Sequence, residues 1–62
     1  MDELTFAEKL KAARKAAGLT QEGVAELIGV PRRTTQNWEA SLNTPPPYVQ
    51  ELILRELKRH AK

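Results

Sequence analysis

The 62-residue sequence predicts an all-α fold, a compact domain of four short helices, and three observations lead to this prediction. Apolar residues recur every three or four positions, no stretch alternates as a strand does, and Gly, Pro or capping residues divide the chain into helical lengths. A chain of this length fits one domain. We therefore expect residues 1–62 to form a single unit, with helices at about 6–17, 21–28, 31–40 and 46–60.

The first helix is predicted to begin at Phe6 and to end just before Gly18. Thr5 and Glu8 have the spacing of a capping box, in which each side chain accepts a hydrogen bond from the other residue's backbone N–H. Apolar residues follow Phe6 at i+4, i+7 and i+11, and glycine readily takes the left-handed conformation that ends a helix. Leu19 is then expected to pack back on the last turn.

Residues 20–39, TQEGVAELIGVPRRTTQNWE, predict two short helices joined by a tight turn. Thr20 is suited to cap the first of them, and Gly29 to end it. Pro31 is suited to the first turn of the next helix, where its missing N–H is not needed. The buried face of the first helix is expected to consist of Val24, Ala25 and Ile28. This is the pattern of a helix-turn-helix.

In the second of these helices, Thr35 and Trp38 are spaced i and i+3 and are expected to face the core. We expect the buried Thr35 hydroxyl to bond to its i−4 carbonyl, and Trp38 to pack in the core and not to stack on a base. The side chains left facing outward are Arg32, Arg33, Gln36 and Asn37. They have the hydrogen-bonding groups that read base edges in a major groove, although a solubilising surface is the alternative.

The last helix follows a loop from 40 to 47, because prolines at 45–47 donate no hydrogen bond to a strand. Its apolar residues span too wide an arc for one contact with a small core. Leu54 and Leu57 are therefore candidates for a homodimer seam, and the alternative is that both are half-buried. The hydroxyl of Tyr48 is a weaker candidate for a phosphate contact.

Composition excludes several classes of protein. The chain has no Cys and one His, and it lacks a paired acid and base, so we expect no metal, no cofactor, no small-molecule ligand and no enzyme activity. No apolar run reaches about 18 residues and the N-terminus has no signal-peptide pattern, so we expect a cytoplasmic protein without membrane association. The net charge is only +2, but basic residues gather at 32–33 and at 52–62. The second group also fits a solvated helix end.

The string LTQEGVAELIGVPRRTTQNWEAS, residues 19–41, resembles the phage-repressor helix-turn-helix family, whose Cro- and Xre-like members have the lambda-repressor-like fold. The chain is most similar to small bacterial or mobile-element members. The resemblance implies a double-stranded DNA partner, with Arg32, Arg33 and Asn37 as chief base readers and Gln36 at the edge of the contact. The implied phosphate contacts are Gln21, Thr34 and Asn43. A structural ion pair between Arg14 and Glu39 is also implied.

The sequence departs from the family pattern at four positions. Pro31 replaces the usual Ser or Thr cap, and Thr35 replaces a buried Val or Ile. Gly23 lies inside a helix, where Ala would be more stabilising. Ser41 stands where the family usually has the Gly that ends the recognition helix.

The expected function is sequence-specific DNA binding by a small transcriptional regulator, a repressor or an antitoxin-like protein, acting as a homodimer on two half-sites. One alternative is an excisionase-like or MerR-like DNA reader, which would continue into a β-wing where this chain has prolines and a helix. A second alternative is an adaptor that keeps the fold and binds a protein through the last helix.

Overall fold

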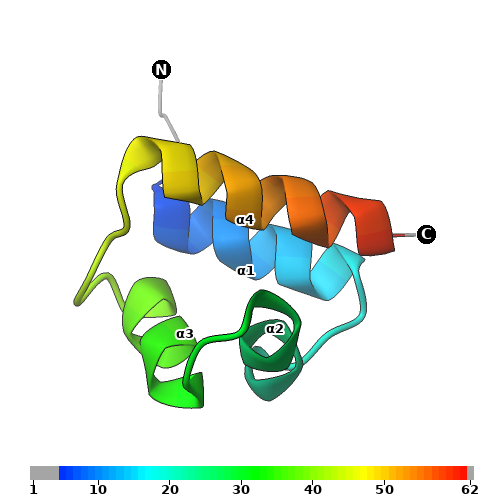
Figure 1. Ribbon diagram of the computed structural model, residues 1–62, viewed down its shortest axis with the longest axis horizontal. Coiled ribbons are helices and arrows are strands. Elements are labelled where there is room, and N and C mark those ends of the chain that lie inside the picture. The colour runs from blue at the N-terminus through cyan, green and yellow to red at the C-terminus, as the bar shows by residue number, and fades with distance from the viewer. Residues whose placement is uncertain (1–4, 62) are drawn as a thin grey trace.

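The computed structural model describes residues 5–61, which fold into four helices and no strand. They are α1 (Phe6–Ala16), α2 (Gln21–Ile28), α3 (Arg32–Glu39) and α4 (Pro47–His60). Figure 1 shows α1 and α4 side by side, with α2 and α3 packed below them. The all-α prediction is confirmed, and each observed helix lies within one residue of its expected bounds.

Capping chemistry sets both ends of α1. Thr5 Oγ1 accepts a hydrogen bond from the Glu8 backbone N–H at 3.2 Å, and the Thr5 N–H donates to Glu8 Oε1 at 3.0 Å, which completes the capping box. At the other end Gly18 has a φ of +71°, and the Leu19 N–H reaches back to the Arg14 carbonyl at 3.0 Å. Leu19 is partly buried against the core, as expected.

The turn between α2 and α3 follows from its residue types. Thr20 Oγ1 accepts from the Gly23 N–H at 3.0 Å and starts α2, and Gly29, with a φ of +89°, ends it. Pro31 has an extended backbone with a ψ of 149°, so it serves as the N-cap of α3 and the helix begins one residue later, at Arg32. Proline has no side-chain acceptor, and the first N–H groups of α3 receive no side-chain cap.

The core joins all four helices. It includes an edge-to-face contact between Phe6 on α1 and Trp38 on α3, with ring centroids 6.1 Å apart. Ala25 is buried on α2, where the helices of the turn motif meet. The other large apolar side chains of the core are Leu10, Val24, Ile53 and Leu57. Trp38 is therefore a packing residue, as predicted.

The prediction that Leu57 lies in a homodimer seam is wrong, and Leu54 is half-buried, which was the alternative to a seam. Leu57 is fully buried in the core, and Leu54 is partly buried and packs against it. The physical reason is that α4 packs against both α1 and α2, so a wide apolar arc on α4 is used inside the molecule. Among the described residues, the large apolar side chains left exposed are Leu42, Tyr48 and Leu52.

Thr35 also differs from the prediction. Its side chain is fully buried, but Oγ1 has no hydrogen-bond partner within residues 5–61, so the expected bond to the i−4 carbonyl is not made. A buried hydroxyl without a partner has lost its hydrogen bonds to water and gained none in return. Thr35 is therefore a source of instability directly beneath the outward face of α3.

Ser41 takes over the conformation that glycine usually provides at the end of such a helix. Its φ is +62°, in the left-handed region. The Leu42 N–H donates to the Asn37 carbonyl at 2.9 Å, and the Ser41 N–H donates to the Trp38 carbonyl at 3.2 Å. These two bonds make a complete Schellman motif, so α3 ends as the family pattern requires despite the missing glycine.

Candidate nucleic-acid interface

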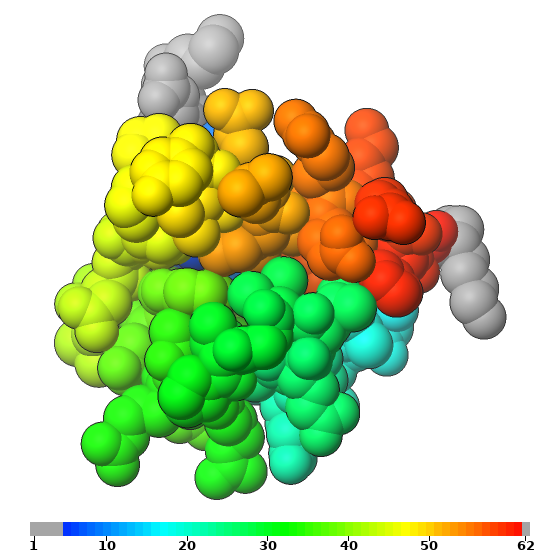
Figure 2. Space-filling model, viewed as in Figure 1, coloured from blue at the N-terminus to red at the C-terminus, as the bar shows by residue number. Residues whose placement is uncertain are grey.

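The outward face of α3 is the best candidate for a nucleic-acid interface. Arg32, Arg33 and Gln36 are exposed, whereas Thr35 and Trp38 on the opposite face of the same helix are buried. In Figure 2 the side chains of α3, in green, project from the lower edge of the molecule. The buried face fixes the orientation of the helix, and the exposed face presents two guanidinium groups and an amide to solvent.

The exposure of the predicted base readers differs from the ranking that the family resemblance implies. Gln36 is four residues after Arg32 and three after Arg33, so it lies between them on the helix surface and is exposed with them. Asn37 and Thr34 are less exposed than these three residues, and both are half-buried. Gln36 is thus central to this face, whereas Asn37 and Thr34 lie toward its margins.

The predicted Arg14–Glu39 ion pair is present and connects three helices. Arg14 Nε on α1 lies 2.7 Å from Glu39 Oε2 at the end of α3, and its Nη1 donates to the Leu19 carbonyl at 3.1 Å. The Glu39 side chain is only 4% exposed. Gln21, the first residue of α2, joins the pair by donating from Nε2 to Glu39 Oε1 at 3.1 Å. A role for Gln21 in this network was not foreseen from sequence.

Asn43 is exposed in the loop between α3 and α4, where its backbone N–H points toward the Asn37 carbonyl at 3.5 Å. The loop is anchored to α4, because Gln50 Nε2 donates to the carbonyl of the buried Pro45 at 2.7 Å. Sequence reasoning missed this anchor, since no local pattern marks a glutamine that reaches back five residues.

The second basic group does not extend the α3 surface. Arg55, Lys58 and Arg59 are exposed on α4, which lies on the other side of the molecule from α3 (Figure 1). Glu56 pairs with Arg59 at 3.3 Å and lies 3.7 Å from His60 Nε2. Lys62 lies outside the described residues. This group fits the solvated, dipole-complementing end of a helix.

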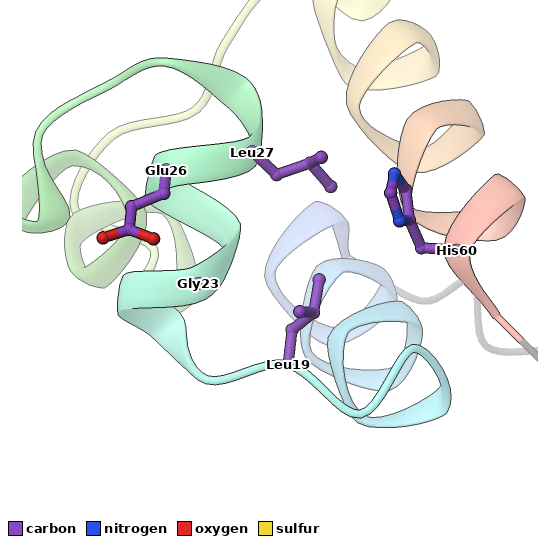
Figure 3. A pocket seen from close by; sticks show the side chains of 5 residues that line it. All are labelled: Leu19, Gly23, Glu26, Leu27 and His60. Carbon is purple, nitrogen blue, oxygen red and sulfur yellow. The ribbon is translucent and has the colours of Figure 1, made fainter.

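A hollow of about 340 Å³ lies between α2 and the end of α4, and its lining residues are Leu19, Gly23, Glu26, Leu27 and His60. Figure 3 shows Leu27 and His60 directed toward each other, whereas the Glu26 carboxylate points away. The acid and the imidazole do not converge on a common point.

Within residues 5–61, no group of three or more His, Asp or Glu side chains could hold a metal ion. In the same range, none of the helices is both long and apolar enough to cross a membrane.

A protein-family model described as helix-turn-helix matches residues 10–60, which include α2, the turn, α3, all of α4 and α1 from Leu10 onward. No curated protein and no solved structure matches the chain. The matched range contains every residue of the candidate interface. The chain belongs to the phage-repressor helix-turn-helix family, the Cro- and Xre-like family of DNA-binding, regulator-type proteins.

Proposed function

We propose that the protein is a sequence-specific regulator, a repressor or an antitoxin-like protein, that places α3 in the major groove of double-stranded DNA. One observation carries the proposal: Arg32, Arg33 and Gln36 are exposed together on one face of a helix whose other face is buried in the core. An α-helix fits the major groove of B-form DNA, where each base pair presents a distinct pattern of donors and acceptors. Such a regulator acts where the DNA is, in the cytoplasm.

Each side chain has a role that its chemistry suits. Arg32 and Arg33 can each donate two hydrogen bonds to guanine O6 and N7, and Gln36 can pair with adenine N6 and N7. Asn37 reads a base at the margin of the contact. The phosphate contacts on either side of the groove come from Gln21, Thr34 and Asn43. Contacts to phosphate set the position of the domain on the duplex and not the sequence that it reads.

A homodimer on DNA is the second part of the proposal. One small module makes few phosphate contacts and binds weakly at physiological salt, whereas two modules on half-sites one helical turn apart add their contacts. Leu42, Tyr48 and Leu52 are exposed apolar side chains that remain available for a contact between copies. Analytical ultracentrifugation with a two-site operator would test this point. A single copy bound without cooperativity would contradict it.

The DNA-reading role is tested by selecting a preferred site from a random DNA pool and then measuring single variants on that site. Arg32→Ala, Arg33→Ala and Gln36→Ala should each weaken binding by about 1–3 kcal/mol and relax the preference at one base position. Arg55→Ala is the matched control, because Arg55 is also exposed but belongs to α4. If the three α3 variants discriminate between sites as well as the wild type does, the proposal is wrong.

A protein-binding adaptor is the one competing function that an observation favours, because Tyr48 and Leu52 are exposed on α4, a different helix from the one that carries the base readers. An NMR titration with mixed-sequence DNA at low salt separates the two functions. A DNA reader shows shifts around Arg33 and Gln36, whereas a pure adaptor shows none. The excisionase-like or MerR-like alternative is not proposed, because the described residues after α3 form a loop and α4 and no β-wing.

A further inference from the structure

We infer that Glu39 is a positioning residue for DNA binding: its carboxylate holds the Gln21 side chain so that the remaining amide N–H points at a DNA phosphate. The inference rests on the proposed function, in which Gln21 is a phosphate contact. Arg14 and Gln21 both donate hydrogen bonds to the Glu39 carboxylate. Glu39 therefore has a role beyond its ion pair with Arg14.

The first step is the chemistry of the amide. A glutamine side chain has two N–H donors on one atom and a carbonyl oxygen on another, and the group can turn to present either end. An ionised carboxylate only accepts hydrogen bonds, so Glu39 selects the orientation in which Gln21 Nε2 faces it, at 3.1 Å. One N–H is thereby used, and the second is fixed on the same nitrogen. A phosphate needs a donor, and this orientation supplies one.

The second step is the rigidity of the carboxylate. Glu39 Oε2 receives Arg14 Nε at 2.7 Å and Oε1 receives Arg14 Nη2 at 3.4 Å, so both oxygens are held by one planar guanidinium. The third nitrogen, Arg14 Nη1, is tied to the Leu19 carbonyl, one residue before the cap of α2. Because the Glu39 side chain is 4% exposed, these bonds form where water competes little.

The third step concerns charge. A carboxylate near a DNA backbone would by itself repel phosphate, and the ion pair with Arg14 offsets that repulsion. Glu39 can therefore orient Gln21 without opposing the contact. Glu39 is also the last residue of α3, so the same hydrogen bond joins the phosphate contact on α2 to the helix that carries the base readers. A fixed phosphate contact then sets how α3 sits in the groove.

A double-mutant cycle on DNA affinity tests the inference. Gln21→Met keeps the length of the side chain but removes the amide, and it should weaken binding to the selected site about tenfold or more. Glu39→Gln should weaken binding about fivefold in the wild-type background, and it should have less than a twofold effect when Gln21→Met is already present. If the two effects multiply, Glu39 acts independently of Gln21 and the inference is overturned. All variants are compared at a temperature at which circular dichroism shows them folded.

Glu39→Gln leaves Arg14 without its counter-charge, so a second measurement keeps the inference testable if that variant does not fold. Hydrogen exchange of the side-chain amides is followed by NMR in the wild-type protein. One Gln21 amide proton should exchange with solvent at least about tenfold more slowly than those of Gln36, which is exposed and serves as the control. Equal rates would overturn the inference.

Failure of the proposed function can be distinguished from failure of this inference. If the wild type selects no DNA site, the proposed function fails. If Arg33→Ala weakens binding and Gln21→Met does not, only this inference fails.

Discussion

Replacing Thr35 by Val should stabilise the domain, although the side chain lies at the centre of the motif. Thr35 is fully buried, and its hydroxyl has no partner within residues 5–61. Burial of an unsatisfied hydroxyl destabilises by about 1–3 kcal/mol, and Val has nearly the same shape with a methyl group in its place. Both residues are β-branched, so helix propensity changes little. We expect the free energy of unfolding to rise by about 1–3 kcal/mol.

In a domain of this size, 1 kcal/mol shifts the midpoint of thermal unfolding by about 4–8 °C, so the change is easily measured by circular dichroism. Urea unfolding gives the same free energy independently. Thr44→Val is the control: Thr44 is exposed, and the same substitution there should change stability by less than about 0.5 kcal/mol. Thr35→Ser keeps the unpaired hydroxyl, removes a buried methyl and should destabilise. If Thr35→Val is no more stable than the wild type, the hydroxyl is satisfied and the reasoning is refuted.

Three further predictions concern the ends of helices and the corrected core. Ser41→Gly should stabilise by about 0.5–1 kcal/mol, measured by urea unfolding, because glycine takes a positive φ without the steric penalty that Ser41 bears at +62°. Thr20→Ala should destabilise by about 1 kcal/mol in the same assay through loss of the α2 cap, and an unchanged midpoint would show that the cap contributes nothing. Leu57→Ala should destabilise by about 2–5 kcal/mol, whereas Leu52→Ala should have an effect below about 0.5 kcal/mol, and comparable losses would contradict the assignment of Leu57 to the core.

The turns and helix starts could be predicted from sequence because their causes are local. A capping box depends on residues three apart, and a left-handed glycine acts at its own position, so Thr5, Gly18 and Gly29 had the expected conformations and bonds. The inward direction of Trp38 followed from helical periodicity alone.

The errors came from contacts between residues distant in sequence. Leu57 was a candidate for a homodimer seam, with half-burial as the alternative, because a helical wheel counts one buried face and cannot show that α4 packs on two neighbours. The bond from Gln21 to Glu39 crosses 18 positions and depends on where α2 meets α3. The burial of Thr35 was predicted, but the lack of a hydrogen-bond partner for its hydroxyl could be seen only in the packed core.

The side chains on the outward face of α3 contribute nothing to the side-chain hydrogen bonds recorded within residues 5–61. Arg32, Arg33 and Gln36 take part in none of them, whereas Glu39 at the end of the same helix holds three helices together. Substitutions at such exposed positions usually change stability by less than about 0.5 kcal/mol. The fold therefore tolerates nearly any polar combination at these three positions, so the hydrogen-bonding groups on this face could change one at a time while the stability of the domain stays nearly the same.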